Sequence, residues 1–179
     1  IIGGVEFYRR KEVKDVIAYL RVIANQNDEE SLLRIMNFPQ RGIGNTTVTR
    51  MIAFARKLDL TLFQTMNRVF EVIDIKERIQ KNVKGFRVLL EKYINLKETL
   101  SVGELSLALI DELGLVKMFK SENTPESRVR LENINQLMAA ISEYSKENKD
   151  AQLDQFLEEV SLISDIDMKD DKKNAVTFL

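Results

Sequence analysis

Two glycines flanking one apolar residue, Gly42-Ile43-Gly44, are the feature of this 179-residue sequence best suited to binding a ligand. A glycine has no Cβ atom, so the backbone here can approach a ligand closely and turn its amides outward. A helix that starts at Asn45 or Thr46 would direct its free N–H groups and the positive end of its dipole to the same place. The pattern therefore predicts an anion site, and a nucleic-acid phosphodiester fits such a site.

The residues beside the two glycines favour the same chemistry. Arg41 can add a charge-assisted hydrogen bond, and Thr46 and Thr47 can add hydroxyl donors. We expect Ile43 to anchor the bend in the core. None of these groups reads a base edge, so binding would be independent of base sequence and sensitive to salt. The alternative is a plain corner between two helices, in which the glycines only relieve a steric conflict.

The composition removes many kinds of catalytic site. The chain has no Cys and no His, which excludes disulfides, thiol chemistry, zinc fingers and imidazole acid–base catalysis. No Gly-Lys-Ser/Thr follows the glycines as it does in a nucleotide-binding P-loop. The acidic run at 165–170 lacks the glycine and the final Glu of a calcium loop. We therefore predict no catalytic residue, no cofactor and no metal in this segment.

The overall balance of residues is typical of a soluble globular chain, with 44% hydrophobic and 31% charged side chains. No run of 18 apolar residues occurs, so we predict no membrane-spanning helix, no membrane partner and a cytoplasmic location. Residues 1–60 carry ten basic and seven acidic side chains, whereas residues 146–173 carry five and nine. A basic front suits a polyanion, although solvated helix faces explain the same charges.

Apolar residues recur at helical spacing along most of the chain, and two prolines and seven glycines are few. The spacing predicts amphipathic helices. Their expected ranges are 10–24, 28–36, 46–58 with Asn45 or Thr46 as the cap, 61–70, 75–99, 105–113, one or two further turns at 115–119, 126–146 and 153–163. We therefore predict an all-α fold, a multi-helix unit with a helix-hairpin-helix-like corner at the two glycines.

Both ends of the chain are rich in β-prone residues. The runs at 1–5 and 175–179 each predict a short β-strand. A two-stranded sheet alone is only marginally stable in water, so we interpret the chain as a segment of a larger, sheet-containing protein. The alternative is a complete small protein whose two end strands pair with each other.

Several stretches resemble one family, in its order and with compatible spacing. Residues 2–21, which include Phe7-Tyr8-Arg9-Arg10-Lys11-Glu12, resemble the block after the fourth conserved motif of superfamily 1 DNA helicases of the UvrD/PcrA/Rep type. Residues 37–44 resemble that family's Asn-x-Pro-x-Arg-Gly-Ile-Gly, with Gln40 where Lys is common. Residues 130–137 resemble its Arg-x-Glu-Asn-Leu/Ile-x-Glu-Leu helix, and residues 175–179 are similar to the strand before its Thr-x-His-x-x-Lys-Gly-Leu-Glu motif.

The resemblance implies the C-terminal segment of an ATP-dependent 3′-to-5′ DNA helicase of repair and replication restart. Residues 1–24 would be a strand and helix left from the second RecA-like domain (2A). Residues 25–173 would be the α-helical 2B accessory subdomain, and residues 174–179 the return strand of 2A. The parent enzyme would hold ATP and Mg²⁺ through motifs outside this chain, so the segment alone would hydrolyse no nucleotide.

Mapped residue by residue, the resemblance makes the glycine loop a contact to the duplex backbone ahead of the fork. The implied contacts are Arg41, Gly42, Ile43, Gly44, Asn45, Thr46 and Thr47. Arg10, which matches the Arg of Phe-Tyr-x-Arg, would contact a single-stranded backbone. Expected partners are DNA, the rest of the helicase chain and repair proteins. The alternative is a helical protein–protein interaction module that binds no DNA in isolation, which a large exposed apolar patch away from the loop would favour.

Overall fold

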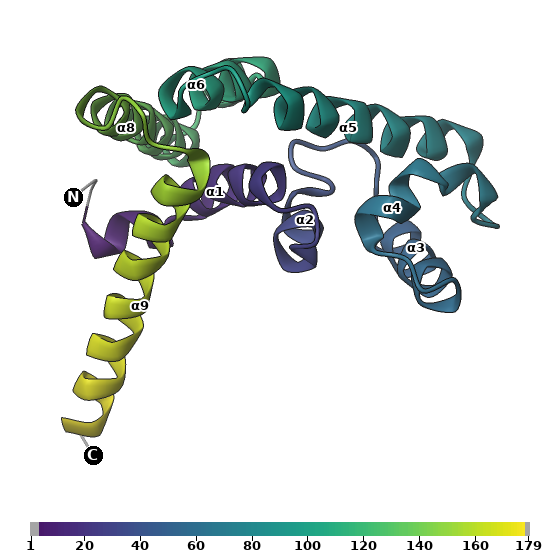
Figure 1. The fold of residues 1–179 in the computed structure, drawn as a ribbon, viewed down its shortest axis with the longest axis horizontal. Helices are drawn as coiled ribbons and strands as arrows, with labels where there is room; N and C mark the ends of the chain where they lie inside the picture. Colours follow the sequence, from purple (N-terminus) through teal and green to yellow (C-terminus); the bar gives the residue numbers. More distant parts are fainter. Residues whose placement is uncertain (1–3, 178–179) are drawn as a thin grey trace. The chain divides into compact units, whose positions relative to one another are not determined.

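The computed structural model describes the backbone of residues 4–177 and, within that range, all side chains except those of 166–171 and 174–177. Figure 1 shows helices joined by short loops. In chain order they are η1 (Val5–Arg9), α1 (Lys11–Ala24), α2 (Glu29–Ile35), α3 (Asn45–Lys57), α4 (Leu62–Asn67), η2 (Val69–Glu71), α5 (Glu77–Leu96), α6 (Val102–Leu113), α7 (Leu115–Glu122), α8 (Pro125–Glu147) and α9 (Leu153–Thr177). Among the described residues, no helix is long and apolar enough to cross a membrane.

The all-α fold class is confirmed, since residues 4–177 contain no strand. The predicted end strands are wrong where the structure describes them: Val5 begins η1, and residues 175–177 end α9. The rest of both predicted strands, residues 1–3 and 178–179, lies outside the described residues. A lone extended segment leaves its N–H and C=O groups unpaired, whereas a helix pairs them locally.

Side-chain caps fix where four helices begin. Asp28, Thr61, Ser101 and Thr124 each accept a hydrogen bond from the backbone amide three residues further on. The last three form capping boxes, in which the third helical residue bonds back to the cap. Gly114, in the left-handed conformation, ends α6 and lets α7 start in a new direction.

The chain divides into two compact units. Unit 1 comprises the described residues of Ile1–Ile17 and Leu100–Leu179, and unit 2 comprises Ala18–Thr99, so one boundary falls inside α1. The subdomain boundaries predicted at 24/25 and 173/174 refer to a larger protein and stay a prediction.

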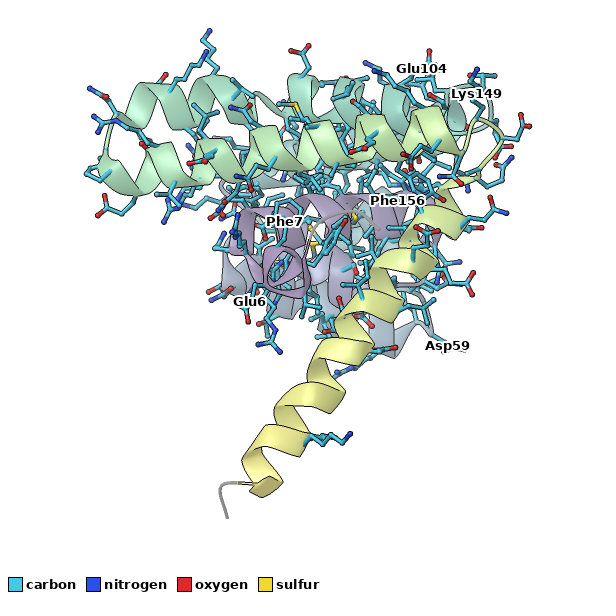
Figure 2. All side chains as sticks on the ribbon, turned by 90° about the vertical axis from the view of Figure 1, so that its left-hand side faces the viewer. Glu6, Phe7, Asp59, Glu104, Lys149 and Phe156 are labelled. Atoms are coloured by element: carbon cyan, nitrogen blue, oxygen red, sulfur yellow. The ribbon has the colours of Figure 1, made fainter. Side chains whose placement is uncertain are left out.

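Unit 1 is built from two groups of helices. α6, α7 and α8 pack on one another, and α9 packs on η1. Phe7 of η1 and Phe156 of α9 are buried, whereas Glu104 on α6 and Lys149 after α8 are exposed (Figure 2). The aromatic rings of Tyr144 and Phe156 meet edge to face, with centroids 5.1 Å apart.

Unit 2 is organised around the short helix α4, which contacts α2, α3, α5 and η2. Its core includes the fully buried side chains of Tyr19, Ile23, Leu32, Ile35, Met51, Leu62, Met66 and Leu90. The glycine loop joins α2 to α3 within this unit, so its geometry is set by residues 18–99 alone.

Candidate nucleic-acid interface

The loop between α2 and α3 is held by side chains rather than by a strand ladder. Asn37 Oδ1 accepts hydrogen bonds from the amide of Arg41 at 2.7 Å and from the amide of Ile43 at 3.1 Å. Asn82 Nδ2, on α5, donates to the carbonyl of Arg41 at 2.8 Å. These bonds replace the cross-strand pairs of a hairpin, so the predicted helix-hairpin-helix corner is not supported.

The two glycines of the loop have different backbone conformations. Gly42 has a φ of +73°, a region that side chains with a Cβ rarely adopt, whereas Gly44 is extended at φ −82° and ψ 176°. Only Gly42 therefore requires glycine on conformational grounds. Ile43 between them is 1% exposed and lies in the core, as expected, while both glycines are exposed.

Arg41 faces the protein rather than solvent. Its Nη1 donates to the carbonyls of Ile35 at 3.0 Å and Phe38 at 2.9 Å, and its Nη2 donates to the hydroxyl of Tyr19. The guanidinium lies over the ring of Phe86, 3.9 Å from the centroid, which adds a cation–π attraction. These contacts direct the guanidinium of Arg41 into the loop, and its predicted contact to DNA stays a prediction.

The start of α3 has the open amides that an anion site needs. The predicted helix start at Asn45 is confirmed, since α3 begins there. Its N-cap is Gly44 and not Asn45 or Thr46, and it has no side-chain cap and no acidic residue in the first turn. Within the part of the chain that the structure describes, no acceptor pairs with the amides of Asn45, Thr46 or Thr47. Asn45 and Thr46 are exposed and Thr47 is half-buried. The dipole and these free N–H groups make this helix end attractive to negative charge.

The sequence analysis missed three residues that belong to this surface. Asn37 and Asn82 hold the loop, as described above. Asn37 opens the motif at 37–44 but received no role in the sequence analysis, and no spacing rule points to Asn82. Arg50 follows Thr46 by four positions, which places it one turn further along the same side of α3. Its Nη1 donates to the carbonyl of Asp74 at 2.6 Å, and the side chain is exposed. Helical periodicity applied to α3 would have found Arg50.

Arg10, the second predicted contact region, belongs to unit 1 and not to the unit that carries the loop. Its Nη1 donates to Asn133 Oδ1 at 2.8 Å and to Gln136 Oε1 at 3.1 Å, and its guanidinium lies 5.5 Å from the ring centroid of Phe7. Nη1 is therefore occupied within the protein, while the residue as a whole is exposed.

Two of the stretches singled out in the sequence bind each other in unit 1. Asn133 Nδ2 donates to Glu12 Oε2 at 2.9 Å, and both side chains are buried. Arg130 Nε lies 3.6 Å from Glu12 Oε1. A buried carboxylate needs such partners, because an unpaired charge in the interior is costly. This network ties the start of α1 to α8, more than 100 residues later in the chain. No group of three or more Asp or Glu side chains in the described residues could hold a metal ion.

Comparison with known proteins gives a consistent result. The family described as "UvrD-like helicase C-terminal domain" matches residues 1–179. The chain is 34% identical over 185 residues to the ATP-dependent DNA helicase PcrA of Bacillus subtilis (strain 168), covering 100% of this chain and 25% of that protein. It is 35% identical over 181 residues to the PcrA helicase of Staphylococcus aureus (strain Mu50), covering 100% of this chain and 24% of that protein. The chain thus spans about a quarter of the length of these relatives.

Proposed function

Since this chain belongs to the family of UvrD-like helicase C-terminal domains, we propose that it is the duplex-contacting segment of an ATP-dependent DNA helicase. The proposal includes DNA and the rest of the helicase chain as partners, and the cytoplasm as location. ATP and Mg²⁺ would be bound by parts of the parent enzyme outside this chain, because the glycine loop lacks the Gly-Lys-Ser/Thr of a nucleotide site.

The open start of α3 is the observation that carries the proposal. Three consecutive helix amides without acceptors in the described structure, beside an exposed Gly42, form a cradle for one phosphate. The hydroxyls of Thr46 and Thr47 lie at the same helix end, and Arg50 adds positive charge one turn further on. These groups bind a phosphodiester backbone and read no base.

The rigidity of the loop supports a binding role. Asn37, Asn82 and Arg41 fix the backbone before any ligand arrives, so little conformational entropy is lost when a phosphate binds. In this proposal Arg41 acts by shaping the loop. Arg10 remains a proposed single-strand contact, because its hydrogen bonds to Asn133 and Gln136 use only Nη1 of the guanidinium.

A charge reversal at the helix start tests the proposal. Thr46→Glu puts an acid in the first turn of α3, where the helix dipole favours it, so we expect stability to stay equal or rise by about 0.3–1 kcal/mol. The same carboxylate repels a phosphate, so we expect affinity for hairpin or forked DNA to fall by about tenfold or more, roughly 1.4 kcal/mol. Fluorescence anisotropy at low salt and urea unfolding measure the two quantities.

Two controls separate a local effect from a general one. Thr46→Gln has the same size without the charge and should keep most of the affinity. Thr99→Glu places the same charge on an exposed threonine after α5, in the same unit, and should change binding little. Equal losses for Thr46→Glu and Thr99→Glu, or unchanged DNA binding by Thr46→Glu, would contradict the phosphate site.

A further inference from the structure

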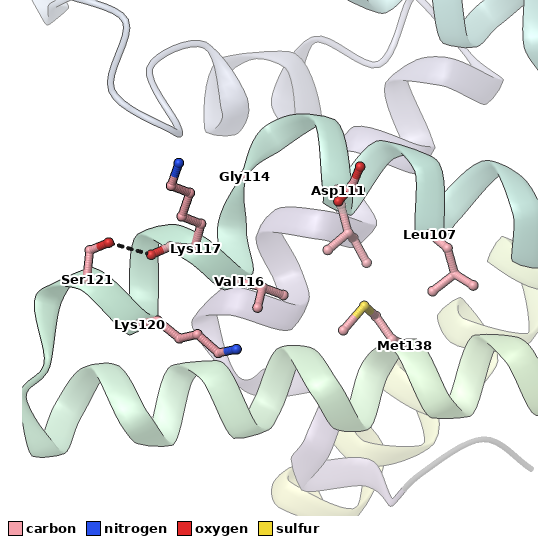
Figure 3. A pocket seen from close by; sticks show the side chains of 9 residues that line it. Leu107, Asp111, Gly114, Val116, Lys117, Lys120, Ser121 and Met138 are labelled. Carbon is pink, nitrogen blue, oxygen red and sulfur yellow. Dashed lines mark hydrogen bonds between the residues drawn. The ribbon is translucent and has the colours of Figure 1, made fainter.

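A hollow of about 740 Å³ lies in unit 1 among α6, α7 and α8 (Figure 3). Much of its wall is apolar and comes from Leu107, Ile110, Val116 and Met138. Gly114 contributes only backbone, and a Cβ atom added there would meet nothing within 4 Å, so this side of the hollow is open. Leu107 is 38% exposed although it is a large apolar residue. The hollow therefore offers apolar surface that the described chain leaves uncovered.

Two lysines of α7 line the same hollow. Lys117 and Lys120 are exposed, and neither ammonium group has an ion pair or hydrogen bond to a described residue. Figure 3 shows the side chain of Lys120 extending toward Val116. The hydroxyl of Ser121 is already used, since it donates to the carbonyl of Lys117 at 2.8 Å. Asp111 is the one acidic residue among the described residues that line the hollow. The charge at this place is therefore positive and complementary to an acidic partner.

We propose that this hollow binds an amphipathic helical segment of a partner protein, which inserts apolar side chains and sets acidic side chains against Lys117 and Lys120. An apolar groove between helices with charge at its rim is the usual geometry for such recognition. Met138 suits this role because its flexible thioether adapts to different apolar surfaces. A nucleic-acid backbone fits less well, since the four apolar side chains offer no hydrogen-bond donor or charge to a phosphate. The hollow lies in unit 1, whereas the proposed phosphate site lies in unit 2.

Two model peptides test the proposal on the full 179-residue chain. Both carry Leu at the same helical positions, and their exposed positions are Glu in one peptide and Lys in the other. We expect the acidic peptide to bind at least tenfold more tightly by fluorescence anisotropy. With the methionine methyl groups labelled with ¹³C, the NMR signal of Met138 should shift when the acidic peptide binds. The signal is assigned by its loss in Met138→Leu. The signal of Met51, buried in unit 2, should not move.

Matched charge variants locate the binding. Lys117→Glu with Lys120→Glu should reverse the preference between the two peptides. Lys146→Glu with Lys149→Glu makes the same charge change at exposed positions near the end of α8 and should leave the affinity unchanged. Equal affinity for both peptides, or no shift of Met138 at millimolar acidic peptide, would overturn the proposal. A Met138 shift caused by duplex DNA instead of the peptide would overturn it too and would assign the hollow to nucleic acid.

Discussion

At the scale of single residues, the structure shows the guanidinium of Arg41 bonded within the protein, while its predicted contact to DNA stays a prediction. A guanidinium can satisfy two carbonyls, a hydroxyl and an aromatic face at once, because its donors are fixed in a planar fork. The sequence motif shows that an arginine stands before the glycines, but it does not show which way the side chain points. Direction depends on Tyr19 and Phe86, which lie 22 positions earlier and 45 positions later in the chain.

Arg41→Lys tests this reading. A lysine keeps the charge but lacks the fork, so we expect unfolding free energy to fall by about 1–3 kcal/mol and DNA affinity to fall with it. If Arg41 instead held a phosphate directly, lysine would keep much of the affinity and stability would not change. Arg56→Lys, at an exposed position on α3, is the control and should stay within about 0.5 kcal/mol of the wild-type stability in urea.

Tyr8 gives a second prediction at this scale. Its hydroxyl is buried and has no hydrogen-bond partner among the described residues. Burial, and secondly the charge of Glu159, raise the pKa of Tyr8 above its ordinary value, so the hydroxyl stays neutral. It also makes no hydrogen bond to a described residue. Tyr8→Phe should therefore leave the free energy of unfolding unchanged or raise it by up to about 1 kcal/mol. A loss of more than about 1 kcal/mol in urea unfolding would show that the hydroxyl has a partner.

At the scale of elements, apolar spacing predicted most of the helices. It misplaced some helix ends, which backbone hydrogen bonds decide. The ranges 75–99 and 126–146 correspond closely to α5 (Glu77–Leu96) and α8 (Pro125–Glu147), because long amphipathic runs leave few alternatives. The predicted helix at 61–70 instead ends at Asn67 and is followed by η2. α9 continues to Thr177 through a polar stretch that lacks the apolar spacing used for prediction. Apolar spacing is what periodicity detects, so a helical stretch whose sequence lacks that spacing escapes it.

Substitutions at two glycines test how closely α6 and α8 pack. A Cβ atom added to Gly103 of α6 would lie 2.9 Å from Ser145 Cβ on α8, too close for two helices that cannot separate freely. Gly85 lies within α5, is exposed, and a Cβ there would meet nothing within 4 Å. We expect Gly103→Ala to destabilise by about 1–3 kcal/mol and Gly85→Ala to stabilise by about 1 kcal/mol. Thermal unfolding of both variants measures the contrast, and the same sign for both would contradict the close contact between α6 and α8.

At the scale of the whole molecule, binding of a polyanion cannot rest on overall charge. The formal net charge is −1, and the excess of basic residues in 1–60 is opposed by the excess of acids in 146–173. Long-range attraction is therefore weak, and any affinity must come from a local site such as the start of α3.

The network between Glu12, Asn133 and Arg130 is a second feature of the whole molecule. A pairing across more than 100 residues could not be predicted from one sequence.

This charge balance leads to a quantitative expectation for salt. Each phosphate that a protein neutralises contributes about −0.9 to the slope of log affinity against log salt concentration for duplex DNA. A helix end with Arg50 nearby neutralises few phosphates, so we expect a slope between about −1 and −3 for the 179-residue chain. Anisotropy titrations with duplex DNA from about 25 to 200 mM salt measure it. Arg50→Ala should make the slope shallower by about 1. A slope steeper than about −5, unchanged by Arg50→Ala, would mean that a broad basic surface and not the start of α3 binds the DNA.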